Sequence, residues 1–218
     1  MGWNGRDDRI AVFNDTESMY KKNDTLKAAV QKSIAEQQLI LEDSEIPGLM
    51  DEPAYLEDAK IIVSKKRSFE AASAYAGKRV CVLNFASATN PGGGVKHGSS
   101  AQEECLCRCS TLYPCINERN ISGGFHYYHR SMLEAGNMNA LYNDDCIYTP
   151  GVIVFKTDES LPKTMPENDW YTVDIITCAA PNLREKPSNS FNPNSGKSAV
   201  KIKDSELRAL HEKRANRI

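Results

Sequence analysis

The sequence contains no apolar run long enough to cross a lipid bilayer, and its first residues, MGWNGRDDRI, lack the apolar centre of a secretory signal. It also has no large excess of one charge, because 27 basic and 29 acidic residues leave a formal net charge of -2. A chain with this balance has no broad electrostatic attraction for nucleic acid. We therefore expect a protein of the reducing cytoplasm, without membrane contact and without direct DNA binding.

Internal repeats, low-complexity tracts and long blocks of like charge are also missing from the sequence. The 218 residues, of which 40% are hydrophobic, are enough to bury one core. We expect a single α/β domain over residues 1–218. In this domain an N-terminal extension over about residues 1–57 precedes a core over about residues 58–218.

The pattern of apolar residues predicts the order of the elements. Short β-branched runs predict strands over residues 59–65, 79–86, 151–156 and 171–180. Residues 9–18 predict a strand followed by a helix cap at Asp15 or Thr16. Helical spacing predicts helices over residues 26–41, 68–77 and 99–113, and a last helix after Asp204. The order strand, helix, strand over residues 59–86 is that of a βαβ unit with a parallel sheet. Residues 182–197, rich in Asn, Pro and Ser, are predicted to form a mobile surface segment.

The run NFASATNPGGGVKHGSSAQEE, from Asn84 to Glu104, joins three consecutive glycines to two adjacent carboxylates. Gly92, Gly93 and Gly94 have no Cβ, so their backbone can take positive φ and present N–H groups to a phosphate. The glycines follow the predicted strand over residues 79–86. They are therefore expected at the carboxyl end of a strand, where open α/β sheets bind ligands.

The two carboxylates have different explanations. Glu103 lies three residues after Ser100, as in a capping box, so it serves either as a helix cap partner or as a functional group. Neither capping nor a Lys at helical spacing explains Glu104, and successive helical residues point about 100° apart. We expect Glu104 to face a cleft. Lys96 and His97, in the loop between, are expected to be solvated.

The combination of GGG, seven residues and QEE resembles the signature of the poly(ADP-ribose) glycohydrolases, whose catalytic domain is a macrodomain. The flanking NFASATNP is similar to the bacterial-type branch of that family. The similarity extends through DIITCAAPN, from Asp174 to Asn182. The resemblance implies a macrodomain-like fold with a mixed, mostly parallel sheet flanked by helices.

The resemblance also implies the chemistry. The reaction is hydrolysis of the ribose–ribose O-glycosidic bond of poly(ADP-ribose), which releases ADP-ribose and uses neither a cofactor nor a metal. Glu104 matches the family's catalytic glutamate, which acts as general acid and base, and Glu103 matches its supporting partner. The expected ligands are ADP-ribose and poly(ADP-ribose), free or attached to proteins.

Substrate contacts follow more loosely from the same resemblance. Asn90 is a candidate ribose ligand, although an Asn-Pro pair also starts turns. Gln102 either positions the loop or touches ribose, and Gly92, Gly93 and Gly94 are expected to grip the diphosphate. A related hydrolase that removes single ADP-ribose units from proteins would use the same glycosidic chemistry.

The end of the sequence departs from the family pattern. The resemblance implies a second phosphate loop, rich in glycine and aromatic residues, after the helix near Asp204 to Ile218. The chain stops inside that helix, so we expect a domain that lacks its C-terminal part. Two alternatives to the hydrolase therefore stay open: a non-catalytic module that binds ADP-ribose, and an inactive fragment. The QEE pair favours the hydrolase, because a binding module has no use for it.

The seven cysteines include a CxCxC pattern, but no C-x-x-C pair of the kind found in structural zinc sites. We expect Cys105, Cys107 and Cys109 to pack rather than to bind metal. In GGFHYYHR, His126 and His129 have an HxxH spacing without an adjacent acidic or cysteine partner. Tyr127 or Tyr128 either stacks on adenine or packs in the core, and core packing is expected for at least one of them.

Overall fold

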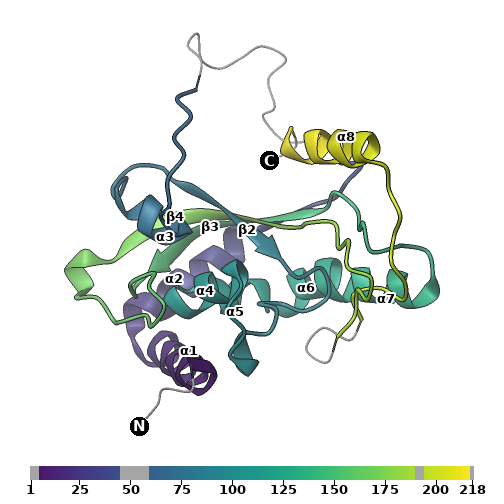
Figure 1. Cartoon of the computed structure of the whole chain (residues 1–218). Coiled ribbons are helices and arrows are strands. Elements are labelled where there is room, and N and C mark those ends of the chain that lie inside the picture. The colour runs from purple at the N-terminus through teal and green to yellow at the C-terminus, as the bar shows by residue number, and fades with distance from the viewer. Residues whose placement is uncertain (1–4, 45–58, 190–193, 217–218) are drawn as a thin grey trace.

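The computed structural model describes residues 5–44, 59–189 and 194–216 (Figure 1). The helices and strands, in chain order, are α1 (Gly5–Lys22), α2 (Asp24–Glu36), β1 (Gln38–Ile40), α3 (Ser68–Ser73), β2 (Cys81–Ala86), α4 (Gln102–Cys109), α5 (Leu112–Ile116), α6 (Arg119–Ser122), α7 (Tyr128–Ala135), β3 (Cys146–Val154), β4 (Tyr171–Ala179) and α8 (Asp204–Ala215). Short 3-10 helices cover Val95–His97 and Glu167–Asp169, and one π-helical turn covers Gly123–Tyr127.

The four strands form one sheet in the order β1-β3-β4-β2. β2 pairs parallel to β4, with Val82 opposite Ile175, whereas β3 is antiparallel to both β1 and β4. The expected mixed sheet is confirmed. The expected majority of parallel pairs is not seen in the described strands, because β3 returns directly into β4 and must therefore run against it.

The core lies between the sheet and the helices on one of its sides. Figure 1 shows α1, α2, α4 and α5 below the sheet and α8 above it. Leu106, Leu112 and Ile116 from these helices meet Val152 and Ile175 from the strands, and all five are fully buried. Cys107 and Cys109 are also fully buried, which agrees with the expectation that they pack.

Several predicted elements are confirmed. The strand predicted over residues 79–86 is β2, the strand predicted over residues 171–180 is β4, and the last helix is α8. The run over residues 151–156 overlaps the second half of β3, which begins earlier, at Cys146. The helix predicted over residues 26–41 ends at Glu36, because Gln38–Ile40 leaves it to pair with β3.

Two predicted strands are wrong. Residues 9–18 lie inside α1, where Phe13, Thr16 and Tyr20 follow one another at helical spacing and form its buried face. Residues 59–65 belong to no helix and no strand in the described chain, and Ile61 is 87% exposed. A β-branched run favours extended backbone, but a strand also needs a partner. The predicted βαβ unit over residues 59–86 is therefore absent.

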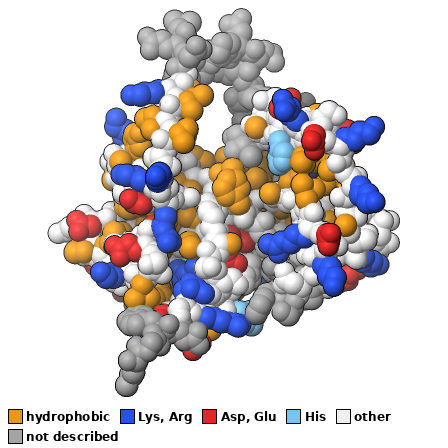
Figure 2. All heavy atoms as spheres, in the orientation of Figure 1, with side chains coloured by type: hydrophobic (Ala, Val, Ile, Leu, Met, Phe, Trp, Pro, Cys, Tyr) orange, Lys and Arg blue, Asp and Glu red, His pale blue; other side chains and the backbone are white. Residues whose placement is uncertain are grey.

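Hydrophobic side chains are exposed near α8. Figure 2 shows such side chains on the surface beside the segment over residues 59–65 and near α8. Ile62, Val63 and Phe85 are among the exposed large hydrophobic residues. Among the described residues, no helix combines the length and the apolar composition needed to cross a bilayer.

In the surface segment predicted over residues 182–197, residues 190–193 lie outside the described residues. Pro187 and Ser195, on either side of them, are buried.

Candidate active site

The triple glycine follows the carboxyl end of β2, as predicted, but two of its three N–H groups donate to carboxylates. The N–H of Gly94 donates to Glu104 Oε1 at 2.9 Å, and the N–H of Gly92 donates to Glu103. The N–H of Gly93 donates to the carbonyl of Asn90 at 2.9 Å. The expectation of an open amide cradle for a diphosphate is therefore corrected. In this structure the amides hold the two glutamates.

The conformation of this loop requires glycine. Gly92 and Gly93 have φ angles of +68° and +55°, in the left-handed region that disfavours side chains. A Cβ at Gly93 would lie 2.6 Å from Glu104 Oε1 and 3.1 Å from Glu103 Oε2. The backbone thus lies directly on the carboxylate pair, where only glycine fits.

Glu103 is bound to β2 and does not cap α4. Its Oε2 accepts a hydrogen bond from the Ser87 N–H at 2.8 Å, and its Oε1 lies 3.5 Å from Asn84 Nδ2. The residue that caps α4 is Ala101, whose methyl side chain accepts no hydrogen bond. The capping-box hypothesis for Ser100 and Glu103 is therefore wrong, and Glu103 belongs to the carboxylate pair.

Burial raises the pKa of Glu103 to about 8, and the adjacent Glu104 carboxylate contributes to the increase. Hydrogen bonds from the backbone N–H groups of Ser87 and Gly92 and from the Asn84 amide act in the opposite direction but do not outweigh burial. At neutral pH the carboxylate pair therefore retains a proton.

This raised pKa predicts a pH-dependent effect of Glu103→Gln on stability. Between the ordinary carboxyl pKa of 4.5 and about 8, the folded protein binds more protons at Glu103 than the unfolded chain does, so this group makes stability fall as pH rises. The neutral amide cannot lose a proton. The melting temperature of Glu103→Gln should therefore rise relative to the wild type as pH increases from about 5 to about 9.

The matched control for that measurement is Glu36→Gln, which removes an exposed carboxylate from the end of α2. It should leave the pH profile of the melting temperature parallel to that of the wild type. A constant difference between Glu103→Gln and the wild type across the whole pH range would contradict the raised pKa of Glu103.

Glu104 combines one fixed oxygen with one unused oxygen. Its side chain is buried, with 6% exposure, and Oε1 is held by the Gly94 N–H. Oε2 is also buried but has no hydrogen-bond partner in the described part of the chain. Buried carboxylate oxygens are normally paired, so an unpaired one marks a position where a ligand, a proton or water completes the site.

Gln102 is engaged with the open edge of β2. Its Oε1 accepts from the Phe85 N–H at 3.0 Å, and its Nε2 donates to the Leu83 carbonyl at 2.7 Å and to Ser68 Oγ at 3.2 Å. Of the two roles left open for Gln102, these contacts favour positioning of the loop over contact with ribose. They tie the first residue of α4 to the strand that carries Asn84.

Asn90 is held in a turn that also contains Arg130. Its Oδ1 accepts a hydrogen bond from Arg130 Nη2 at 2.7 Å, and its N–H donates to Ser87 Oγ at 3.2 Å. The same guanidinium nitrogen donates to the Thr89 carbonyl at 2.8 Å. The sequence analysis did not single out Arg130, and no local pattern connects it with a residue 40 positions earlier.

Asn84 is a second residue that the sequence analysis missed. It is fully buried, and its Nδ2 donates to Thr177 Oγ1 at 3.1 Å and lies near Glu103. The sequence did carry a signal for Asn84, because an amide in the middle of the apolar run VCVLNFA needs a buried polar partner.

Lys96 and His97 are exposed, as expected, and the Lys96 ammonium lies 5.3 Å from the centre of the Tyr113 ring.

The histidines and tyrosines of residues 126–129 face opposite ways. His126 and His129 are fully buried, and burial lowers the pKa of His126 to about 3. Tyr127 and Tyr128 are 46% and 39% exposed, so the preference for core packing of at least one of them is wrong. Helical geometry turns the two histidines inward and the two tyrosines outward.

In the part of the chain that is described, no group of three His, Cys, Asp or Glu side chains is placed to hold a metal ion.

Two cavities lie at the end of the sheet where β1, β2 and β4 finish. One, of about 480 Å³, is lined by residues that follow β2 and β4, among them Ser87, Pro181 and Asn182. Ser87 connects this cavity to the carboxylate pair through its bond to Glu103.

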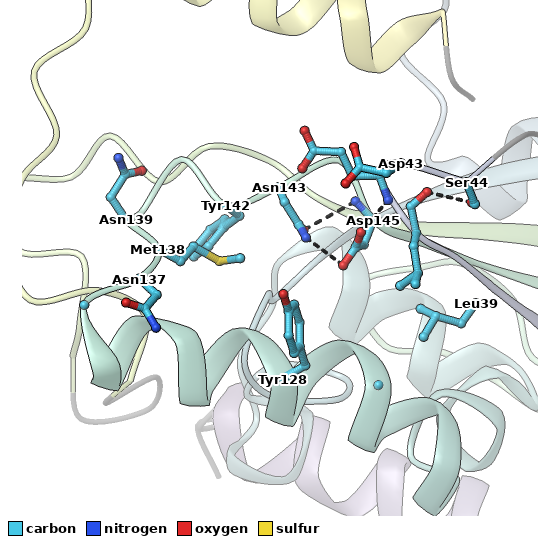
Figure 3. A pocket seen from close by; sticks show the side chains of 14 residues that line it. Leu39, Asp43, Ser44, Tyr128, Asn137, Met138, Asn139, Tyr142, Asn143 and Asp145 are labelled. Carbon is cyan, nitrogen blue, oxygen red and sulfur yellow. Dashed lines mark hydrogen bonds between the residues drawn. The ribbon is translucent and has the colours of Figure 1, made fainter.

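The other cavity, of about 1090 Å³, lies over β1 and α7 (Figure 3). Figure 3 shows Tyr128 rising from α7 toward Asn143 and Asp145, with Met138 beside it. Neither Glu103 nor Glu104 lines this larger cavity. We place the candidate active site at the carboxylates, because they carry the reactive groups, and not at the larger cavity.

Comparison with known proteins identifies the family of the chain. The sequence profile described as "Microbial-type PARG, catalytic domain" matches residues 9–157, a stretch that contains the triple glycine and both glutamates. The chain belongs to this family of poly(ADP-ribose) glycohydrolase (PARG) catalytic domains. Membership places it among the hydrolases of the glycosidase class. A search of curated proteins gave no match.

Solved PARG structures share the fold. PARG from Thermomonospora curvata is 24% identical, with a TM-score of 0.71 over 96% of this chain and 73% of that one. The same enzyme bound to the inhibitor ADP-HPD is 25% identical, with a TM-score of 0.69 over 96% and 72% of the two chains. PARG from Deinococcus radiodurans in complex with ADP-ribose is 25% identical, with a TM-score of 0.58 over 86% and 68%. The macrodomain-like PARG fold is thereby established.

Proposed function

We propose that this PARG domain hydrolyses the ribose–ribose O-glycosidic bond of poly(ADP-ribose) and releases ADP-ribose, with Glu104 as general acid and base. The observation that carries the proposal is the pair of unlike oxygens on Glu104. Oε1 is fixed by the Gly94 N–H, and Oε2 is buried without a partner in the described chain. One oxygen orients the group, and the other is left for the reacting atoms.

The reaction needs a proton and then a base. Glu104 donates its proton to the departing ribose oxygen as the bond from that oxygen to the anomeric carbon breaks, which leaves an oxocarbenium-like centre. The Glu104 carboxylate then accepts a proton from water as the water oxygen attacks the anomeric carbon. Glu103 is proposed to support this role as the neighbouring carboxyl group, whose raised pKa of about 8 keeps its own proton bound at neutral pH.

The remaining site residues are proposed to position the sugar. Gly92, Gly93 and Gly94 are proposed to contribute by bringing the backbone onto the carboxylates that face the substrate. The side-chain NH2 of Asn90 is proposed to donate to a ribose hydroxyl, while its Oδ1 stays bonded to Arg130. Gln102 is proposed to act on substrate through the loop, because its amide is occupied by β2 and Ser68.

The ligand is proposed to be an ADP-ribose unit, free or at the end of a polymer attached to protein. The neighbouring structures support this proposal, since one relative binds ADP-ribose and another binds the inhibitor ADP-HPD. The cavity of about 480 Å³ beyond β2 and β4 is the proposed place for the rest of the nucleotide, because Ser87, which lines it, donates its N–H to Glu103. We further propose that residues 1–218 act as a single domain of a cytoplasmic enzyme.

A release assay combined with a binding assay separates this proposal from its alternatives. Incubation with poly(ADP-ribose) should release ADP-ribose, and ADP-ribose should raise the melting temperature of the protein. Binding without release would instead identify a non-catalytic module, and the absence of both would identify an inactive fragment. A parallel assay on a protein that carries single ADP-ribose units tests the related hydrolase, for which we expect slower release.

A further inference from the structure

Three arginines donate to three successive carbonyls of the loop between the triple glycine and Gln102. Arg6 Nε donates to the carbonyl of His97 at 2.8 Å, and Arg9 Nε donates to that of Gly98 at 2.6 Å. Arg108 Nη1 donates to the carbonyl of the next residue, Ser99, at 2.7 Å. We call Arg6, Arg9 and Arg108 the arginine brace. Two of its members come from α1 and the third from α4.

The loop turns its N–H groups inward and its carbonyls toward the brace. The N–H groups of His97 and Ser99 both donate to the carbonyl of Gly94, at 2.9 Å and 3.1 Å. Gly94 is also the residue whose own N–H holds Glu104. The brace therefore acts on the same turn that fixes the catalytic carboxyl group.

α1 lies directly against the loop at Gly98. This residue has a φ of +70°, and a Cβ there would lie 2.5 Å from the carbonyl oxygen of Arg6 and 3.1 Å from Ile10 Cγ1. The loop contains glycine at Gly94 and Gly98, and glycine gives a chain much conformational freedom. A loop of this composition needs outside contacts to keep one conformation.

α1 itself is firmly held. Thr16 Oγ1 donates to the carbonyl of Arg108 at 2.6 Å, and the buried Lys156 Nζ donates to the carbonyl of Val12 at 3.1 Å and to Asp15 at 2.6 Å. The Phe13 ring packs edge-on against a ring of α5. A fixed helix can therefore hold a flexible loop in place.

We propose that the arginine brace keeps the glycine loop in the geometry in which the Gly94 N–H meets Glu104, so that Arg6 and Arg9 are positioning residues for glycosidic cleavage. This proposal rests on the proposed function. Reacting groups must be held to within a fraction of an ångström, and a misplacement of about 1 Å can slow a reaction about 100-fold. The brace acts on Glu104 through the Gly94 N–H, because the loop that it holds contains Gly94.

The test uses the double variant Arg6→Gln/Arg9→Gln, which leaves the buried Arg108 in place to support folding. The matched control is Lys21→Gln, which removes a positive charge from the other end of α1, where Lys21 pairs with Glu17 at 3.7 Å. We expect kcat on poly(ADP-ribose) to fall about tenfold in the double variant, with KM changed less than about twofold. Lys21→Gln should retain the wild-type values.

The conservative variant Arg9→Lys and amide hydrogen exchange give readouts that loss of stability alone would not reproduce. Arg9→Lys keeps the charge and one donor, so it should lose less kcat than Arg9→Gln. Exchange at residues 92–99 should be faster in the double variant and unchanged in Lys21→Gln. The proposal for the arginine brace would be overturned if amide exchange at residues 92–99 were unchanged in the double variant. An unchanged kcat together with a lowered melting temperature would also overturn it.

Amide hydrogen exchange also distinguishes a failure of the arginine brace from a failure of the proposed function. If the wild type releases no ADP-ribose, the proposed function fails, whereas faster loop exchange in the double variant would still support the brace. If the wild type is active and the double variant is equally active, the brace fails and the proposed function stands.

Discussion

Glu104→Gln is expected to reduce the release of ADP-ribose from poly(ADP-ribose) by about 1,000-fold, because general acid–base catalysis contributes about 100-fold to 10,000-fold. The amide has the shape of the carboxyl group. Its oxygen can still accept the Gly94 N–H, but it can neither donate an acidic proton to the leaving oxygen nor act as a base toward water. Binding of ADP-ribose should be retained, since the loop keeps its hydrogen bond. Initial rates of release and calorimetric titration with ADP-ribose measure the two effects separately.

The control for this variant is Glu36→Gln, an exposed carboxylate on α2 far from the loop in sequence. It should match the wild type in both assays. Wild-type turnover in Glu104→Gln would remove Glu104 from the mechanism, and a loss of turnover that only parallels a loss of folded protein would show a structural role.

Gly93→Ala is expected to produce the second-largest loss, about 100-fold in kcat together with a lower melting temperature. The added Cβ would lie 2.6 Å from Glu104 Oε1 and 3.1 Å from Glu103 Oε2, so the carboxyl groups or the loop must move. The φ of +55° adds about 1 to 2 kcal/mol of backbone strain for a residue with a Cβ. The variant therefore combines strain with displacement of the reactive groups.

Gly77→Ala separates these two effects. Gly77 also has a positive φ, of +83°, but a Cβ there would meet no atom within 4 Å. It should lower the melting temperature through strain alone and leave kcat unchanged. Equal kcat losses in Gly77→Ala and Gly93→Ala would show that activity depends on stability and not on the position of the carboxylates.

The sequence was sufficient to predict that the triple glycine and the two glutamates lie together after β2. The spacing from Gly94 to Glu104 fits one short loop and the first turn of a helix, and β2 is a short apolar run that ends in the loop. The directions of the N–H groups were not predictable in the same way. Positive φ at Gly92 and Gly93 was expected and is observed, but spacing alone does not indicate which buried acceptors, such as Glu104 and the Asn90 carbonyl, bind the loop N–H groups.

The other features that the sequence did not predict depend mostly on contacts between residues far apart in the chain. Residues 59–65 have the composition of a strand, but no sequence pattern shows whether a partner strand is present. The apolar start of residues 9–18 predicted a strand, but Phe13, Thr16 and Tyr20 have helical spacing and pack as the buried face of α1. The arginine brace joins residues about 90 positions apart, through backbone carbonyls that carry no sequence signal.

A structure of Glu104→Gln with ADP-ribose bound tests the central claim most directly. We expect the anomeric carbon of the terminal ribose to lie about 3.5 Å from the side chain at position 104, beside Gly93, with the rest of the nucleotide toward Ser87 and Asn182. ADP-ribose bound instead in the larger cavity beside Tyr128 and Met138, with the side chain at position 104 still buried and untouched, would contradict it.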